Sequence, residues 1–268
     1  MNEELKKLLP PTSYLLPEFL WLASYALDLS SSQIMAREKF SDDEIEKINS
    51  LIKRRENHEP LQYIMGVADF YGRDFEVGEG VLIPRHDTET LIEAAKKYFL
   101  PEKKFIFLDW GTGSGCIAVT LLLEFKNSFA VMLEKSPDAI YYAKKNLERF
   151  NLKDRAEIIS EIPQKNFDLI ISNPPYIPSH EIKNLMPEVK NFEPELALDG
   201  GIDGMNFYRL IFSQAKHVLK SDGYIILETG NLEQVSALKN LDGNFIFEDE
   251  FLDTGNFPRC LVFRRNEK

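Results

Sequence analysis

From Phe105 to the C-terminus, short runs of apolar and β-branched residues alternate with longer segments that have helical periodicity. Repeated βα units connect through right-handed crossovers, which build a mostly parallel sheet with helices on both faces. We therefore predict an α/β fold in which the last two strands close the sheet as a hairpin-like pair. The strand candidates are residues 105–110, 129–133, 157–160, 167–172, 224–227, 245–247 and 260–263.

The turn after the first of these strands is rich in glycine and comprises Gly111, Thr112, Gly113, Ser114 and Gly115. Glycines let the backbone approach a ligand closely, and a helix is predicted directly after the turn. The spacing matches neither the dinucleotide fingerprint nor the phosphate loop. The next strand ends at Glu134, whose carboxylate can accept hydrogen bonds from ribose hydroxyls. These features predict a ribose-bearing ligand without a strong indication of phosphate binding.

The strand at residues 167–172 ends at Asn173-Pro174-Pro175-Tyr176. Proline cannot continue a paired strand, and the residue before a proline is pushed to an extended conformation. We therefore expect the Asn173 carboxamide on a stiff loop, at the same sheet edge as the glycine turn. A carboxamide offers one acceptor oxygen and two donor hydrogens, which suits recognition of another flat amide or amino group. An ordinary turn explains the Asn-Pro pair equally well when it is taken alone.

The first 60 residues are predicted to form helices. The clearest helix follows Ser41, because Glu44 three residues later has the spacing of a capping box. Residues 60–84 mix β-forming side chains with glycines, which predicts a hairpin of short strands from the start of that segment. The next helix is predicted to start with Asp87 or Thr88 as its cap.

The charge balance argues against broad attraction to nucleic-acid phosphates, because the formal net charge is −11 and the pI is about 5.0. The basic triplet at residues 53–55 is interpreted as a solvated helix end, since glutamates are interleaved with it.

Cys116 and Cys260 form no CxxC pattern and the four histidines lack metal-ligand spacing, so we expect no metal. Without a signal-peptide core or a run of roughly 20 apolar residues, we predict a cytoplasmic protein that has no membrane partner.

Several blocks resemble, in the same order, the HemK/PrmC family of class I S-adenosylmethionine methyltransferases. Two of them are the most specific: VLIPR at residues 81–85 and EPELALDGGIDG at residues 193–204. The glycine turn, NPPY at residues 173–176 and ETG at residues 228–230 accompany them. NPPY alone is shared with adenine-N6 methyltransferases and with the ribosomal-protein glutamine methyltransferase.

The resemblance implies a Rossmann-like, seven-stranded catalytic domain at residues 85–268, a substrate-recognition bundle at residues 1–60 and a β-hairpin linker at residues 61–84. It implies methylation of the GGQ glutamine of peptide chain release factors, which modulates translation termination. The cofactor is then S-adenosyl-L-methionine, and the product S-adenosyl-L-homocysteine. A monomer without direct nucleic-acid contact is expected. The implied cofactor-binding residues are Gly111, Thr112, Gly113, Ser114, Gly115, Glu134, Ile162 and Asn173.

Some positions depart from the family pattern. Glu134 stands where an aspartate is usual, and its extra methylene still permits ribose contact. Glu161 and Ile162 occupy the place of an aspartate–aromatic pair beside the adenine, so stacking there is expected from Ile162 or from elsewhere. His86 and Asp87 replace a more usual Pro-Glu pair.

An amide nitrogen is a poor nucleophile because its lone pair is delocalised into the carbonyl. The protein therefore has mainly to orient this nitrogen and to complement charge. We expect the Asn173 side-chain oxygen and the Pro174 carbonyl to accept hydrogen bonds from the two N–H groups of the target glutamine. Pro175 and Tyr176 complete the substrate site, with Tyr176 as a wall of the pocket. Asn173, Pro174 and Tyr176 are thus the expected catalytic residues.

Arg85 and Glu89 are expected to order the hairpin over the cofactor. Phe70 and Phe75 either cover the cofactor or belong to an interdomain core, and the core is favoured.

Two other substrates stay open, a ribosomal protein and the adenine of a nucleic acid. Enzymes that methylate adenine in nucleic acids are expected to carry a basic recognition domain. A Rossmann-like interaction module without catalysis is a further alternative, which the intact motifs count against.

Overall fold

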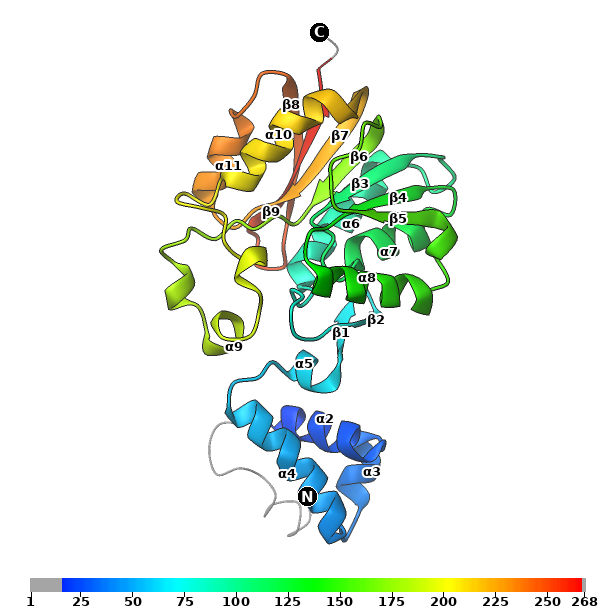
Figure 1. Ribbon diagram of the computed structural model, residues 1–268, viewed down its shortest axis with the longest axis vertical. Coiled ribbons are helices and arrows are strands. Elements are labelled where there is room, and N and C mark those ends of the chain that lie inside the picture. The colour runs from blue at the N-terminus through cyan, green and yellow to red at the C-terminus, as the bar shows by residue number, and fades with distance from the viewer. Residues whose placement is uncertain (1–15, 267–268) are drawn as a thin grey trace.

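The structure, a computed structural model, describes residues 16–266 (Figure 1). The N-terminal part consists of α2 (Leu16–Leu27), α3 (Ser31–Ala36) and α4 (Asp42–Glu56). These helices pack around an apolar cluster of their own, which includes Phe19 and Ile48. The predicted helices are thus confirmed in the described residues, whereas the part of that prediction that falls on residues 1–15 lies outside them.

The capping box at the start of α4 is confirmed. The Glu44 amide donates to Ser41 Oγ at 3.3 Å, and the Ser41 amide donates to Glu44 Oε2 at 2.9 Å. Two otherwise unpaired backbone donors are satisfied in this way, which fixes where the helix begins.

The interpretation of the basic triplet as a solvated helix end is wrong for Arg55. Its side chain is 15% exposed, and its guanidinium forms ion pairs with Glu18 at 3.4 Å and with Glu188 at 2.6 Å. Glu188 belongs to the short helix α9 (Pro187–Lys190), which lies far along the chain. Arg55 therefore joins the N-terminal helices to the segment that follows β6.

A five-residue helix, α5 (Leu61–Met65), stands where the first strand of the hairpin was expected. The Pro60 carbonyl accepts the first hydrogen bonds of this turn, and Gly66 ends it with a left-handed φ of 74°. The hairpin is consequently shorter than predicted. It consists of β1 (Val67–Phe70) and β2 (Arg73–Glu76), paired antiparallel.

The remaining strands form one seven-stranded sheet in the order β5-β4-β3-β6-β7-β9-β8. The first five in this order pair in parallel, and β9 pairs antiparallel with both β7 and β8. This arrangement confirms the mostly parallel sheet and its closing hairpin-like pair. The strands are β3 (Ile106–Trp110), β4 (Phe129–Leu133), β5 (Ala156–Ile159), β6 (Phe167–Ser172), β7 (Leu219–Glu228), β8 (Phe245–Leu252) and β9 (Pro258–Arg265).

Helices cover both faces of the sheet, as predicted (Figure 1). On one face the core contains side chains of three helices: α6 (Glu89–Tyr98), α7 (Cys116–Glu124) and α8 (Pro137–Arg149). On the other face it contains side chains of α10 (Asn206–Val218) and α11 (Leu232–Lys239).

Thr88 occupies the N-cap position of α6, as predicted, but its side chain does not cap the helix. A 3-10 turn, η1 (His86–Thr88), runs directly into α6, so Thr88 has helical backbone angles and makes no side-chain cap bond. A cap residue needs an extended backbone to aim its side chain at the first free amides. The Thr88 side chain is therefore free for a contact outside the helix.

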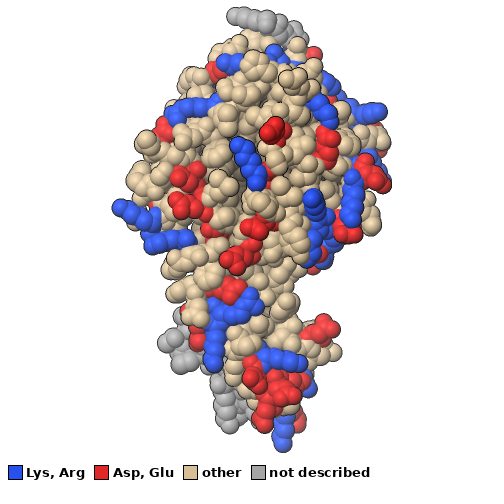
Figure 2. Space-filling model, in the orientation of Figure 1, with Lys and Arg blue, Asp and Glu red and all other residues tan. Residues whose placement is uncertain are grey.

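Basic and acidic side chains are interspersed over the face shown in Figure 2. Residues 16–266 contain no helix that is both long enough and apolar enough to cross a membrane.

Candidate active site

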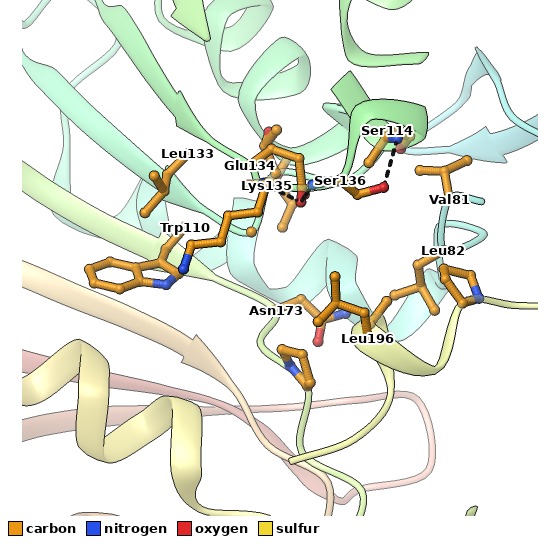
Figure 3. A pocket seen from close by; sticks show the side chains of 18 of the residues that line it. Val81, Leu82, Trp110, Ser114, Leu133, Glu134, Lys135, Ser136, Asn173 and Leu196 are labelled. Atoms are coloured by element: carbon orange, nitrogen blue, oxygen red, sulfur yellow. Dashed lines mark hydrogen bonds between the residues drawn. The ribbon is translucent and has the colours of Figure 1, made fainter. Parts of the chain in front are cut away.

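A cavity of about 390 Å³ opens at the carboxyl ends of the parallel strands, where such sheets bind ligands (Figure 3). Most of the residues singled out from the sequence line it: Gly111, Thr112, Gly113, Ser114, Glu134, Ile162, Asn173 and Pro175. Three others, Gly115, Pro174 and Tyr176, do not line it. The structure therefore brings the glycine turn, the acid and the Asn-Pro loop to one cavity.

The glycine turn is folded against the end of β4. The amides of Gly111 and Thr112 donate to the last carbonyl of β4 at 2.9 and 3.1 Å. A Cβ on Gly113, whose φ is 55°, would meet no protein atom within 4 Å, so its backbone faces open space. A Cβ on Gly115 would instead lie 2.9 Å from Met132 Cε. Gly115 thus permits close packing of α7 on the sheet, whereas Gly113 presents bare backbone to the cavity.

Glu134 is held by backbone amides. Its Oε2 accepts a hydrogen bond from the Gly113 amide at 3.0 Å, and its Oε1 accepts from the amides of Lys135 and Ser136 at 2.8 and 3.0 Å. These bonds fix the carboxylate at the mouth of the glycine turn. A carboxylate has about four lone-pair sites on its two oxygens, and three of them are used here, which leaves one on Oε2. The longer side chain of glutamate therefore still has an acceptor for a ribose hydroxyl.

The end of the cavity beside β3 and β4 is apolar. Trp110 and Ile162 line it from the sheet side, and Phe207 lines it from α10. Such a surface suits the flat, apolar face of an aromatic base. Glu161 lies on the same rim and offers a carboxylate to a polar edge.

The Asn-Pro loop is anchored from beneath. Asn173 Nδ2 donates to Thr88 Oγ1 at 3.0 Å, and Pro174 is buried. The Tyr176 hydroxyl donates to Glu228 Oε1 at 3.2 Å, and burial raises the pKa of this phenol. Tyr176 does not line this cavity, and its ring lies against Gly230 just after β7. Its role as a wall for the substrate glutamine stays a prediction.

Two buried acids near the site were not among the predicted site residues. The Asp109 carboxylate accepts a hydrogen bond from the Thr112 hydroxyl, and burial raises the pKa of Asp109 to about 7. Burial likewise raises the pKa of Glu228 to about 7. Both acids stand at the carboxyl end of an apolar strand, at the edge where such sheets bind ligands. That position was the available signal in the sequence.

The wall opposite the glycine turn is the 3-10 turn η4 (Glu195–Ala197), whose Leu196 lines the cavity (Figure 3). It is anchored by Glu193, which forms an ion pair with Arg85 and accepts the Ile83 amide at 3.2 Å. Arg85 was expected to order the hairpin. The structure shows that it holds this wall instead.

Glu89 does contact the hairpin, because its Oε1 accepts the Tyr71 amide at 2.9 Å. Phe70 and Phe75 are fully buried in the core beneath the sheet. The favoured interpretation of these two rings as core is confirmed.

Comparison with known proteins shows the family. The PrmC N-terminal domain family matches residues 18–66, and the methyltransferase small domain family matches residues 87–190. A release factor glutamine methyltransferase of Geobacter sulfurreducens is 41% identical over 78% of this chain and 75% of its own length. One of Thermodesulfovibrio yellowstonii is 35% identical over 99% of this chain and 98% of its own. The chain belongs to the release factor glutamine methyltransferase family. The HemK/PrmC resemblance is thereby confirmed.

Other matches fit this family and its fold. A bifunctional methyltransferase of Rickettsia bellii is 38% identical, and this chain spans 45% of its length. A solved methyltransferase structure from Pyrococcus furiosus superimposes with a TM-score of 0.56 at 19% identity, covering 81% of this chain and 98% of that one. That likeness concerns the fold alone. The seven-stranded, mostly parallel sheet is the Rossmann-like fold of class I methyltransferases.

Proposed function

We propose that this chain transfers a methyl group from S-adenosyl-L-methionine to the side-chain nitrogen, N5, of the glutamine in the GGQ motif of peptide chain release factors. This modification modulates translation termination. The observation that carries the proposal is the position of Asn173, whose carboxamide lines the same cavity as Gly113 and Glu134. A group able to grip an amide thus lies beside a cradle for a ribose-bearing ligand. The names of the relatives support a release factor as substrate.

The residues of the cavity fit this cofactor. Glu134 would accept hydrogen bonds from the ribose hydroxyls, the backbone of residues 111–114 would approach the ligand closely, and Ile162 with Trp110 would flank the adenine. Asn173, which also lines the cavity, would lie at the border between cofactor and substrate. The bound cofactor supplies an electrophilic methyl group on a sulfonium, and S-adenosyl-L-homocysteine is the product.

The chain's own contribution is orientation. Asn173 Oδ1 and the Pro174 carbonyl accept hydrogen bonds from the two N–H groups of the glutamine side chain. These two hydrogen bonds fix the direction of the nitrogen lone pair. Both acceptors favour the build-up of positive charge on that nitrogen during transfer. Pro175 lines the cavity beside them and shields the site from water. The proton then leaves to water. No step calls for a metal.

Each segment of the chain has its own proposed role. Residues 1–60 form a bundle that recognises the release factor, residues 61–84 form the linker, and residues 85–268 form the catalytic domain. The protein acts in the cytoplasm as a monomer, without direct contact to nucleic acid. The Arg55–Glu188 ion pair supports a defined placement of the bundle, since it ties α4 to a segment beyond the active-site loop.

The test is a set of parallel incubations of the full chain with methyl-labelled S-adenosyl-L-methionine. The acceptors are a release factor, the same release factor with its GGQ glutamine replaced by alanine, a ribosomal protein fraction, and DNA or RNA. We expect label on the intact release factor alone. Label on ribosomal protein or nucleic acid, with none on the release factor, would overturn the proposed substrate.

A further inference from the structure

One end of the Asn173 carboxamide is already engaged inside the protein. Its Nδ2 donates to Thr88 Oγ1 at 3.0 Å, and Thr88 is 2% exposed. The Thr88 amide donates to the Arg85 carbonyl at 3.1 Å, so the turn that carries the hydroxyl is itself hydrogen-bonded. A threonine hydroxyl has one hydrogen to donate and lone pairs with which to accept. The direction of its bond with Asn173 therefore depends on where this hydrogen goes.

Glu228 offers the hydroxyl hydrogen an acceptor. It is the last residue of β7 and is 1% exposed. The Thr88 hydroxyl is close enough to lower the pKa of Glu228, against the larger effect of burial. Its Oε1 accepts the Tyr176 hydroxyl, while Oε2 has no hydrogen-bond partner within residues 16–266. Above its raised pKa of about 7 the Glu228 carboxylate is ionised and can only accept hydrogen bonds. When the Thr88 hydrogen points to Glu228, only lone pairs of Thr88 face Asn173.

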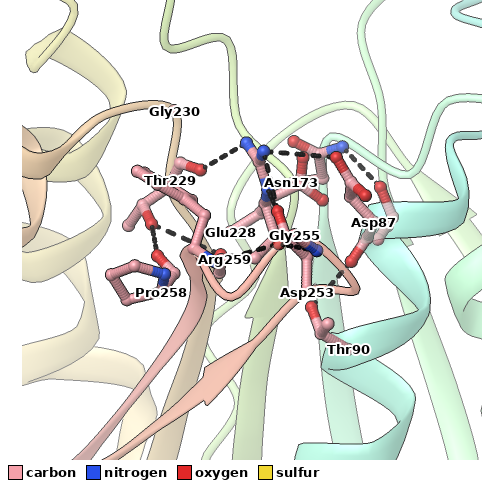
Figure 4. A network of polar contacts seen from close by, with 12 residues as sticks. Asp87, Thr90, Asn173, Glu228, Thr229, Gly230, Asp253, Gly255, Pro258 and Arg259 are labelled. Carbon is pink, nitrogen blue, oxygen red and sulfur yellow. Dashed lines mark hydrogen bonds and ion pairs between the residues drawn. The ribbon is translucent and has the colours of Figure 1, made fainter.

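Arg259 ties the surrounding segments together (Figure 4). It donates to the Thr229 carbonyl at 3.0 Å and forms ion pairs with Asp253 at 3.1 Å and with Asp87 at 3.2 Å. These contacts join η1, the end of β7 and the start of β9. Arg259 and Asp87 are also the charged groups that act on Glu228, in opposite directions. The frame around the carboxylate is thus fixed on several sides.

We propose that Thr88 and Glu228 are positioning residues that hold the Asn173 carboxamide with its oxygen, and not its NH₂ group, toward the substrate. This inference rests on the proposed function. It also assigns a basis for specificity, because an oxygen attracts the NH₂ group of glutamine and repels the carboxylate of glutamate. A carboxamide that is free to rotate would present its NH₂ group to a carboxylate and lose this discrimination.

The test uses Thr88→Val, which removes the hydroxyl and keeps the shape of the side chain. We would measure the affinity of the full chain, in the presence of S-adenosyl-L-homocysteine, for a release factor and for its Gln→Glu form at the GGQ motif. The preference for the glutamine form should fall about fivefold to tenfold, the effect of one directional hydrogen bond. Methyl transfer should slow, and the affinity for S-adenosyl-L-homocysteine should not change.

Three variants complete the test. Thr120→Val is the matched control, because Thr120 is a buried threonine of α7 whose hydroxyl has no partner within the described residues. Thr88→Ser retains the hydroxyl and should restore the preference. Glu228→Gln, which offers Thr88 both a donor and an acceptor, should also reduce it, and serves if Thr88→Val does not fold.

Different results would overturn the proposed function and the positioning role of Thr88 and Glu228. A wild-type chain that does not methylate the release factor overturns the proposed function. A wild-type chain that does so, with an unchanged preference in folded Thr88→Val or Glu228→Gln, overturns the positioning role alone.

Discussion

Asn173 and Thr88 are 85 residues apart in the sequence, yet Asn173 Nδ2 donates to Thr88 Oγ1 at 3.0 Å. The bond joins the loop after β6 to the turn before α6. It engages the nitrogen end of a carboxamide that lines the cavity. The oxygen end is left for a ligand, which is the arrangement that a clamp on a substrate NH₂ group requires.

Asn173→Ala should separate binding of the cofactor from transfer. The variant loses the acceptor for the glutamine amide but keeps the glycine turn and Glu134, so we expect near wild-type affinity for S-adenosyl-L-methionine. Methyl transfer should fall about a hundredfold or more, as for the loss of one preorganised hydrogen-bonding group. Calorimetry and a rate assay check the two quantities. Asn184→Ala, in a 3-10 turn that does not line the cavity, is the control. Transfer by Asn173→Ala at the wild-type rate would refute the amide clamp.

Gly113→Ala should weaken cofactor binding. The backbone of Gly113 has φ 55°, which costs a residue with a Cβ about 1 kcal/mol or more, and the new methyl group would lie toward the cavity. We expect affinity for S-adenosyl-L-methionine to fall at least about tenfold, or about 1.4 kcal/mol. Gly243→Ala is the matched control, because a Cβ there also meets no atom within 4 Å and its φ is not positive. Equal affinity in both variants would contradict the assigned role of the turn.

Arg55→Met should affect the protein substrate and not the cofactor. The substitution breaks the ion pairs with Glu18 and Glu188 and so loosens the tie between α4 and α9. The KM for a release factor should rise roughly twofold to fivefold, the range of a partly exposed ion pair. Arg54→Met is the control, since Arg54 pairs with Glu59 close to its own helix. A KM that rises equally in both variants would show that the tie has no special role.

The buried acids predict how stability depends on pH. The pKa of Asp109 and that of Glu228 are both raised by burial to about 7 in the folded chain, from 3.8 and 4.5 respectively. Their contribution to the free energy of unfolding is therefore complete below about pH 4 and is lost as the pH rises through about 7. The loss for each group is a few kcal/mol. Urea denaturation of the ligand-free chain at several pH values measures it.

Glu228→Gln should remove one of these titrations. The variant should gain stability over the wild type at pH 8 and show a smaller fall between pH 5 and pH 8. An unchanged slope would mean that Glu228 is already ionised at the lower pH.

The sequence was sufficient for the features that depend on local pattern. The alternation of strands and helices predicts the sheet, because strand ends of parallel units converge on one edge, and this brought Glu134 and Asn173 together. The prediction of a strand at α5 was wrong, since a five-residue run with four apolar or aromatic side chains fits a strand as well as a helical turn. Glu228 was seen as part of a motif but not as a site residue. Its closeness to Thr88 depends on how the end of β7 and η1 are placed in the fold, which no local pattern records.

Contacts between surface side chains also divide into those set by local sequence, which were predicted, and those set by tertiary packing, which were not. The capping box of Ser41 and Glu44 spans four residues of sequence, and it was predicted correctly. The pairing of Arg55 with Glu188 spans 133 residues, and the local mixture of charges favoured a solvated helix end. Long side chains at helix ends are the groups whose partners are chosen by tertiary packing.

The central claim is that the methyl group goes to the side-chain nitrogen of one glutamine. The most direct measurement is fragment-ion mass spectrometry of a release factor after incubation with the full chain and S-adenosyl-L-methionine. The account predicts one added methyl group, placed by the fragment series on the GGQ glutamine and retained on its side-chain amide. A methyl group on any other residue, or an unmodified release factor beside a chain that binds the cofactor, would contradict it.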